Sequence, residues 1–368
     1  MTYLAFRNLF QQKLRLALSI GGVTLAVTLI VLLNGFLQGI YAQVTAYLDN
    51  NPADLIVAQD GVTNLLSATS LLPSNTEDLA RGVPGIAQTM PIISQFVILD
   101  IQDEKVVAYL VGYDPDLGGG PWALLAGRLP ADDDEVVLDW VMAETHGFGL
   151  GDTIEILDEE FTVVGLSDGT NSWMASFLFM EKRAAEELFL TPDATSFVFL
   201  SLEPGTDPAT VIGRLRRRMR DVEILPTGTV KQNDLDLLVQ VFAIPMQMMV
   251  AIAFAVGTAI LGMVIYSATV ERVKEYGVLK AVGASNWHLY WLVAQQGLVT
   301  ALLGVSIGIG LAWLAAQWIM TVYPQFLVIF QPYSVVTTAF TGLIMGLLAA
   351  LLPARYVGRL DPARVFRK

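Results

Sequence analysis

Four long apolar stretches, none of them interrupted by a charged residue, constrain the fold of this chain more than any other feature. They lie at about residues 17–40, 242–265, 291–313 and 335–352. Each comes close to or exceeds the roughly 20 helical residues that cross a hydrocarbon layer about 30 Å thick. The sequence therefore predicts four transmembrane helices.

The segment between the first two stretches has a different composition. Of the 368 residues in the chain, 54% are hydrophobic and 15% are charged, yet residues 41–236 hold 11 basic and 32 acidic side chains. This composition predicts a water-soluble domain and argues against nucleic acid as a partner. The chain has no cysteine, so an external domain must rely on its own core instead of disulfides.

Basic residues flank the apolar stretches on one side only. Residues 1–16 carry three basic and no acidic side chains, the loop 266–288 has a net charge of +1, and residues 353–368 have a net charge of +4. Basic flanks favour the cytoplasmic side of a membrane. We therefore expect both termini and the loop in the cytoplasm, and the acidic segment outside. The first stretch lacks a suitable cleavage site and exceeds a signal-peptide core, so we expect a retained anchor in the cell membrane.

The predicted fold is thus membrane α-helical, with four transmembrane helices, cytoplasmic termini and an extracytoplasmic α+β domain inserted between helices 1 and 2. Helical patterns also extend beyond the first two spans as stalks, with a candidate kink at Pro245. The predicted segments are an elbow helix (1–16), helix 1 with its stalk (17–48), the outer domain (49–233), a stalk with helix 2 (234–265), a cytoplasmic loop (266–288), helix 3 (289–320), a short outer loop (321–334), helix 4 (335–352) and a cytoplasmic tail (353–368).

Short β-type and helical patterns alternate through the outer domain, which is typical of an α+β fold in one lobe or two. The predicted strands are 54–59, 91–101, 105–113, 135–141, 152–157, 160–166, 176–180 and 195–203. The predicted helices are 75–82, 139–146, 181–189 and 208–220, the last of which starts with a favourable Thr-Asp-Pro entry.

Several kinds of chemistry have no motif in this sequence. There is no GxxxxGK[ST] phosphate loop, no HExxH and no CxxC. The only histidines, His146 and His288, fall on opposite sides of the membrane, which excludes a multi-histidine metal site within one chain. We therefore expect no enzymatic activity, no cofactor and no ATP site in this chain.

Three other patterns are better explained by structure than by function. The GxSxG match at 165–169 is followed by a turn and a strand, whereas a nucleophile elbow needs a helix there, so we interpret it as a hairpin turn. The acidic run 132–135 lacks the spacing of a calcium loop and predicts a solvated loop. The arginines of 214–220 are expected on the wet face of a helix that buries Val211, Ile212, Leu215 and Met219.

The loop between helices 2 and 3 carries the most specific pattern, ERVKEYGVLKAVGAS at 271–285. Helical spacing of its charges alone is compatible with a solvated helical hairpin. The run from Arg272 to Ser285, however, closely resembles the signature of the MacB/FtsX-like ABC permease family. Residues 5–22 resemble the elbow and first span of that family. The stretch 127–157 resembles its extracytoplasmic core domain, and Leu352–Arg355 with Leu360–Ala363 resembles its tail.

The resemblance implies a permease that pairs with a second copy or a related permease and binds a separate ATP-binding subunit, which would hold ATP and Mg. A membrane-fusion or other extracytoplasmic protein is a further expected partner. The loop would form a coupling helix that docks into the ATPase and passes its closure to the stalks and outer domain, a motion called mechanotransmission. The coupling residues expected from this resemblance are Glu271, Arg272, Lys274, Glu275, Tyr276, Gly277, Leu279, Lys280, Gly283, Ala284 and Ser285.

Small residues in the last two spans offer surfaces for close helix approach, although glycine is common in membrane helices in any case. The packing candidates are Gly304, Gly308, Gly342 and Gly346.

Two functions remain open from the sequence. The first is export or extraction of a hydrophobic substrate, such as a lipid, a lipopeptide, a macrolide-like compound or haem. The alternative is an FtsX-like regulator that activates an outer partner such as a cell-wall hydrolase. The residues considered for haem are Tyr41, Tyr47, Asp234, Asp236 and Met246–Met249, for which core and stalk packing is the competing interpretation.

Overall fold

The computed structural model describes residues 13–66, 69–172 and 174–360, which fall into two compact units. One contains the described parts of Met1–Gly39, Phe242–Tyr323 and Val328–Lys368, and is called the membrane unit here. The other contains the described parts of Ile40–Val241 with Pro324–Leu327, and is called the outer unit. The predicted elbow helix up to residue 12, and the tail beyond Leu360, lie outside the described residues.

Four helical segments among the described residues are long and apolar enough to cross a membrane, which confirms the four predicted spans. They are α2 (Lys13–Asn50), the continuous segment Thr227–Glu271, α10 (Asn286–Val322) and α11 (Pro332–Gly358). With 38 residues, α2 is about 57 Å long. It is therefore longer than a hydrocarbon layer of about 30 Å.

Proline positions shape two of these segments. Residues 227–271 form α7 (Thr227–Leu238), a π-helical turn η1 (Val239–Ala243) and α8 (Ile244–Glu271). Pro245 lies in the first turn of α8, where its missing N–H costs least, and the wider π turn precedes it. Pro353 lies inside α11, which ends at Gly358 instead of Leu352. Neighbouring helices commonly permit such a proline in membrane helices.

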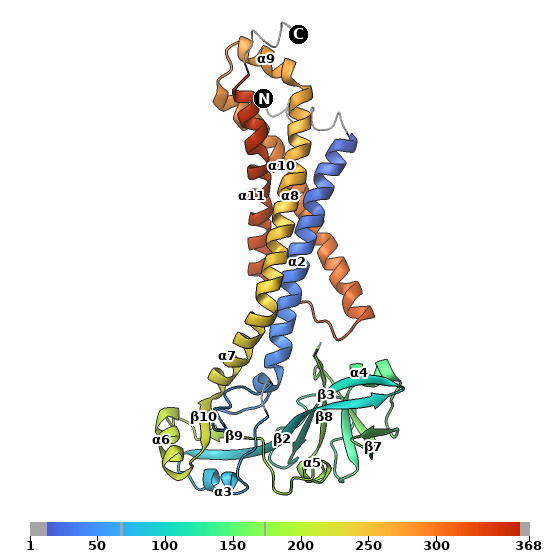
Figure 1. The fold of residues 1–368 in the computed structure, drawn as a ribbon, viewed down its shortest axis with the longest axis vertical. Helices are drawn as coiled ribbons and strands as arrows, with labels where there is room; N and C mark the ends of the chain where they lie inside the picture. Colours follow the sequence, from blue (N-terminus) through green and yellow to red (C-terminus); the bar gives the residue numbers. More distant parts are fainter. Residues whose placement is uncertain (1–12, 67–68, 173, 361–368) are drawn as a thin grey trace. The chain divides into compact units, whose positions relative to one another are not determined.

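The membrane unit is a bundle of α2, α8, α10 and α11 (Figure 1). Its core contains Val23 and Val27 of α2, Leu261 of α8, Val293 of α10 and Met345 of α11, all fully buried. The Thr24 and Thr28 hydroxyls donate to the Gly304 and Gly308 carbonyls at 3.3 and 3.1 Å. These two hydrogen bonds tie α2 to α10.

The outer unit is built on one mixed sheet with the strand order β10-β1-β9-β2-β3-β8-β5-β7-β4, with β6 paired to β7. The β3–β8 and β5–β7 pairs are parallel and the remaining pairs are antiparallel. The strands are β1 (Leu55–Gln59), β2 (Ile86–Ile101), β3 (Glu104–Tyr113), β4 (Leu124–Gly127), β5 (Glu135–Asp139), β6 (Thr153–Ile156), β7 (Glu159–Ser167), β8 (Ser176–Glu181), β9 (Phe197–Leu202) and β10 (Val222–Pro226).

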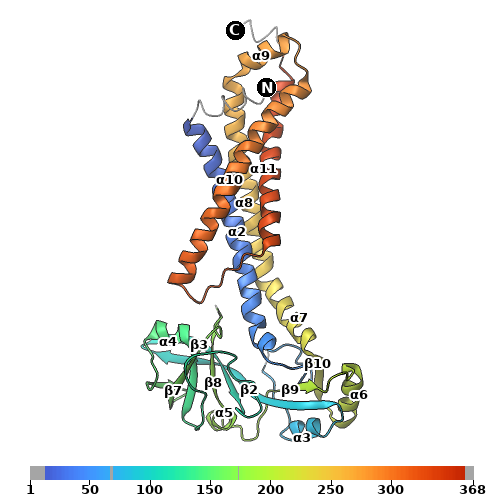
Figure 2. The same ribbon diagram turned by 180° about the vertical axis from the view of Figure 1, so that it is seen from behind.

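Because side chains alternate along a strand, the apolar residues of each strand lie on both faces of the sheet. Leu55 and Val57 of β1 face a cluster with α3 (Thr76–Arg81) and α6 (Pro208–Arg218). Farther along the sheet, residues of α4 (Trp140–His146) and α5 (Lys182–Leu188) share a second buried cluster with β2, β3, β5 and β8. Figure 2 labels both helices. On the opposite face, Ile56 joins an aromatic cluster that includes Tyr47 of α2 and Val230 of α7. One sheet thus supports two separate cores on one face and a single core on the other.

The structure confirms an α+β domain inserted between the first and second membrane helices. All eight predicted strands and four predicted helices are present with shifted ends. The sequence missed β4, β10 and the start of α7, which lies within the segment predicted as outer domain. Val211 and Leu215 of α6 and the following Met219 are buried, and Arg216, Arg217 and Arg218 are exposed, as the pattern of that segment predicts. Ile212 and Arg214 are instead half-buried.

Candidate coupling site

The charged segment after α8 folds into one short helix, α9 (Val273–Ala281), followed by a tight turn. Gly283 has a φ of +101°, a left-handed conformation that favours glycine, and its N–H donates to the Lys280 carbonyl at 3.1 Å. Ser285 then caps α10, because its hydroxyl accepts from the His288 N–H at 3.4 Å. The Gly-Ala-Ser sequence at 283–285 therefore separates the end of α9 from the start of α10.

One side of α9 packs into the membrane unit. Tyr276 is 6% exposed and joins the core cluster that contains Leu261 and Ile265 of α8. Burial raises the pKa of Tyr276 to about 12, so its hydroxyl stays neutral at physiological pH. Gly277 is buried next to it. These contacts fix α9 against the helix that precedes it.

Lys280 ties α9 to the end of α11. Its ammonium donates to the carbonyls of Gly358 and Leu360 at 2.7 and 2.8 Å. A helix leaves its last carbonyls without intrahelical partners, and a positive charge is favourable there. The Tyr290 ring of α10 packs so closely on Gly358 that a β-carbon at that position would overlap it. Movement of α9 would therefore be transmitted to both α10 and α11.

The other side of α9 is open. Lys274 and Glu275 are exposed, and neither has an ion-pair partner among the described residues. The side chains of Val278 and Val282 are 46% and 83% exposed. A surface that combines both signs of charge with apolar side chains can bind a partner of complementary charge and shape.

The structure divides the residues that the sequence assigns to the coupling site. The exposed ones are Glu271, Lys274, Glu275, Gly283 and Ser285, and the partly or fully buried ones are Arg272, Tyr276, Gly277, Leu279, Lys280 and Ala284. Sequence reasoning missed Val278 and Val282. Their spacing was the available signal, because Lys274, Val278 and Val282 follow one another at four-residue steps on one helical face.

The four packing glycines lie where helices meet. A β-carbon at Gly304 would be 2.6 Å from Val23 Cβ, and one at Gly308 would be 2.9 Å from the Thr24 carbonyl oxygen. At Gly346 it would be 2.6 Å from Ala301 Cβ, and at Gly342 it would overlap Val305. The first two glycines therefore face α2, whereas the other two lie against α10.

The GxSxG segment belongs to a buried polar network in the outer unit. Ser167 ends β7 fully buried, bonds Thr170 Oγ1 at 2.6 Å and donates to the Leu138 carbonyl at 3.2 Å. Thr170 in turn donates to Asp139, which caps α4 through the N–H groups of Val141 and Met142. The serine is therefore a core residue and not an exposed nucleophile.

The acidic run also has structural partners. Glu135 is 7% exposed, pairs with Arg128 and accepts from the Ala131 N–H. The Arg128 hydrogen bond holds the pKa of Glu135 below its ordinary value. Asp133 pairs with Arg183. Among the residues that the structure describes, no group of three or more metal-ligating side chains could hold an ion.

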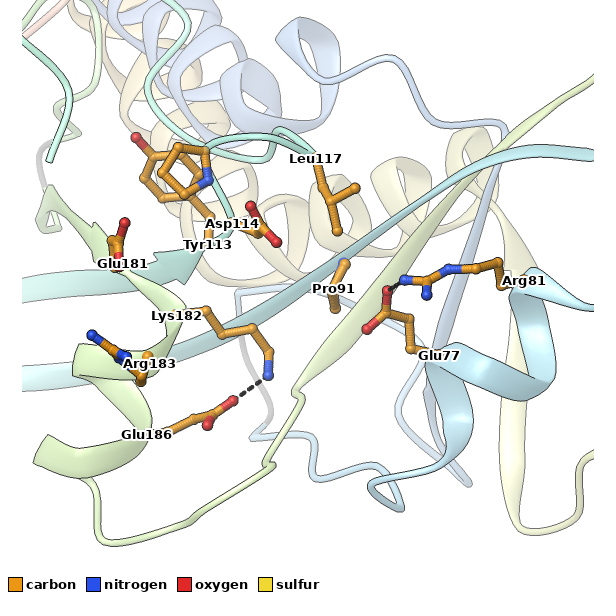
Figure 3. Close-up of a pocket in the computed structure, with 11 residues that line it drawn as sticks. Glu77, Arg81, Pro91, Tyr113, Asp114, Leu117, Glu181, Lys182, Arg183 and Glu186 are labelled. Carbon is orange, nitrogen blue, oxygen red and sulfur yellow. Dashed lines mark hydrogen bonds and ion pairs between the residues drawn. The ribbon is translucent and has the colours of Figure 1, made fainter. Parts of the chain in front are cut away.

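A polar pocket of about 380 Å³ lies in the outer unit between α3, the end of β3 and the start of α5 (Figure 3). Its charges largely neutralise one another, because Glu77 pairs with Arg81 and Lys182 pairs with Glu186. Burial, with Asp133 and other carboxylates nearby, raises the pKa of Glu181. The residues that line it include no histidine, serine or threonine, so they do not form a serine–histidine or threonine–histidine pair.

The residues considered for haem divide between packing and surface. Tyr47 is 1% exposed, donates to the Gly119 carbonyl at 2.6 Å and stacks on Phe177. Asp234 is 3% exposed and accepts from the backbone N–H groups of Leu65 and Leu66. Both are core residues of the outer unit. Tyr41 and Met246 are partly buried, and Asp236, Gln247, Met248 and Met249 are exposed.

Two family models match the chain. The MacB-like periplasmic core domain matches residues 16–218, and the FtsX-like permease C-terminal domain matches residues 247–362. The first match covers α2 and most of the outer unit, and the second covers α8 to α11 with the candidate coupling site.

Similar proteins span the whole chain. An uncharacterised ABC transporter permease of Mycobacterium tuberculosis is 25% identical over 370 residues, covering 100% of this chain and 99% of the relative. A Staphylococcus haemolyticus protein named as a hemin transport system permease, HrtB, is 20% identical and covers 98% of this chain and 97% of its own. A Pseudomonas syringae protein named for syringafactin export, an ATP-binding/permease protein, is 24% identical over 98% of this chain and 57% of its own length.

Proposed function

Because the chain belongs to the family of MacB-like and FtsX-like ABC transporter permeases, a family of multi-pass cell-membrane proteins, we propose that it exports or extracts a hydrophobic substrate using ATP hydrolysed by a separate subunit. The exposed face of α9 is the surface that we propose binds this subunit. The observation that carries it is the division of α9 into one face anchored to α8, α10 and α11 and one charged face that is open.

We place the energy source of the proposed transporter in a separate subunit. The chain has no phosphate loop, whereas the similar syringafactin-export protein is named for ATP binding as well as permease function and extends well beyond the matched region. An ATP-binding subunit that holds ATP and Mg would therefore complete the transporter. We include a second permease, either a copy of this chain or a related one, because the resemblance to the family implies such a pair. We also include an extracytoplasmic partner such as a membrane-fusion protein.

In the proposed mechanism, α9 transmits the movement of the ATP-binding subunits to the membrane helices. Closure of the ATP-binding subunits on ATP would press on Lys274, Glu275 and Val278. The contacts of Tyr276 and Lys280 would pass this displacement to α8 and α11, and α8 continues through η1 and α7 toward the outer unit. The substrate class remains hydrophobic, with lipids, lipopeptides, macrolide-like compounds and haem as candidates, and one relative is named for hemin transport.

The test is an ATPase assay on the permease co-purified with its ATP-binding subunit, across a panel of hydrophobic compounds. Exchanging the two surface charges, Lys274→Glu with Glu275→Lys, preserves net charge while placing like charges against the partner. We expect the affinity for the ATP-binding subunit to fall at least about tenfold, which corresponds to 1.4 kcal/mol. Arg217→Glu, a charge reversal at an exposed outer residue, serves as the control and leaves the affinity unchanged.

An unchanged affinity and ATPase rate in the charge-exchanged variant would contradict the coupling role of α9. Stimulation of the wild-type ATPase by one class of compound identifies the substrate. A coupled ATPase that no compound stimulates contradicts export and favours the regulator that activates an outer partner such as a cell-wall hydrolase.

A further inference from the structure

A groove of about 930 Å³ runs between α8 and α11 in the membrane unit. Its lining includes the small residues Ala259, Gly262 and Ala349, which are called its floor here. A β-carbon at Gly262 would lie 3.4 Å from the Ala349 carbonyl oxygen, so the two backbones approach closely there. Met263 and Leu352 stand on its two sides with 76% and 72% of their surfaces exposed. The larger side chains thus leave a hollow that faces away from the bundle core.

The length of the groove matches one leaflet of a bilayer. On α8 its lining extends from Phe254 to Tyr266, which is about 18 Å along the helix axis. Half of the hydrocarbon layer is about 15 Å thick. Helix α8 runs from the outside to the cytoplasm, because the outer unit precedes it in the chain. Helix α11 runs the same way, because α10 crosses back to the outside between them. The ends of the groove at Tyr266 and Arg359 therefore lie at the cytoplasmic surface.

The cytoplasmic end of the groove is positively charged. Arg355 lies in the last turn of α11 and Arg359 directly follows that helix, and both are exposed. Among the described residues, neither guanidinium has a hydrogen-bond or ion-pair partner. The Tyr266 and Tyr356 rings meet edge to face beside them, with centroids 5.5 Å apart. Basic residues near the cytoplasmic surface explain topology by themselves, but these two also close an apolar groove.

We propose that this groove binds an anionic phospholipid of the cytoplasmic leaflet. Its acyl chain would lie on the floor formed by Ala259, Gly262 and Ala349, and its phosphate would accept hydrogen bonds from Arg355 and Arg359. Guanidinium groups match phosphate geometry well, and basic pockets between helices on the cytoplasmic side suit anionic head groups. The proposal does not depend on which substrate the transporter moves.

A second copy of the chain fits this groove less well than a lipid does. A twofold axis along the membrane normal that passed through the groove would place identical patches against each other at the same depth. Arg355 and Arg359 of one copy would then face the same two residues of the other. A lipid phosphate instead neutralises the pair, and an acyl chain fills the hollow above Gly262.

Native mass spectrometry of the purified full-length permease tests this proposal, with phosphatidylglycerol and phosphatidylcholine as the lipid probes. We expect the wild-type protein to retain phosphatidylglycerol with at least tenfold higher affinity. Arg355→Gln with Arg359→Gln removes that preference, and Gly262→Leu, which fills the floor, lowers the binding of both lipids. Arg217→Gln in the outer unit and Gly310→Leu, at an exposed position of α10, are the matched controls and change neither lipid's affinity.

Equal affinity of the wild-type protein for the two lipids, or an unchanged preference in the double arginine variant, would overturn the proposal. The same spectra report the oligomeric state. If Gly262→Leu dissociated a dimer and left lipid binding intact, the groove would be occupied by a second copy and not by a lipid.

Discussion

Asp139 carries a carboxylate into the core of the outer unit. It is fully buried, caps α4 and accepts a hydrogen bond from Thr170. Desolvation by burial raises its pKa from 3.8 to about 6, against the opposing effect of these hydrogen bonds. Because the folded protein then binds a proton that the unfolded chain releases, this group lowers stability as the pH rises from about 4 to about 6.

Asp139→Asn keeps an N-cap side chain and removes the titration. We expect the free energy of unfolding of the wild-type protein to fall relative to the variant between about pH 4 and pH 6, by about 3 kcal/mol, and the difference to be constant above that range. Urea unfolding of the full-length protein in detergent at several pH values measures this difference. Parallel curves for the two proteins would show that Asp139 does not titrate in this way.

The lysines of α9 show what a sequence can and cannot reveal at this scale. Lys274 and Lys280 belong to one recognisable pattern, and both are expected to serve the coupling surface. The structure leaves Lys274 exposed and directs Lys280 to the carbonyls of Gly358 and Leu360. That second role depends on a contact across 78 and 80 residues of chain, which no local pattern encodes.

Helix packing in the membrane unit depends on which side a glycine faces. Gly308 and Gly310 are both helical glycines of α10, two positions apart. A β-carbon at Gly308 would be 2.9 Å from the Thr24 carbonyl oxygen and from Val27 Cβ, whereas nothing lies within 4 Å of one at Gly310. The two positions therefore form a matched pair within one helix.

Gly308→Leu is expected to force α2 away from α10 and to break the Thr28 hydrogen bond to the Gly308 carbonyl. Overpacking of this kind costs roughly 1–3 kcal/mol, while Gly310→Leu should change stability by less than about 0.5 kcal/mol. Thermal unfolding of the two variants in detergent compares them. Equal losses for both would contradict the packing of α2 on α10.

Strand prediction was easiest where the pattern was long, and both strands that it missed are short. The 16-residue β2 and its partner β3 combine β-branched and apolar residues that identify a strand without its neighbours. In contrast, β4 has four residues that alternate poorly, and β10 is defined by its antiparallel pairing with β1, far away in sequence. Spacing also predicted that Gly304 and Gly308 of α10 pack against another helix. It did not show that this helix is α2, or that Gly310 is open.

At the scale of the whole molecule, composition and charge decide most of what can be predicted. Four uncharged stretches and three basic flanks suffice for the number of spans and for their orientation, because the membrane acts on hydrophobicity and charge directly. The division of α9 into an anchored face and an open face is not accessible that way. It follows from how α8, α10 and α11 pack around Tyr276 and Lys280.

If the open face of α9 binds an ATP-binding subunit, a crosslinker attached to that face must reach the subunit. Because the chain has no cysteine, a single introduced cysteine can carry the crosslinker. A single cysteine at Val278, labelled with a maleimide photo-crosslinker, is irradiated in the co-purified complex. Arg217→Cys, on the outer unit, is the control. We expect a permease–ATPase adduct from Val278→Cys and none from Arg217→Cys. An intact complex without an adduct from Val278→Cys, or with equal adducts from both positions, would contradict binding at the open face of α9.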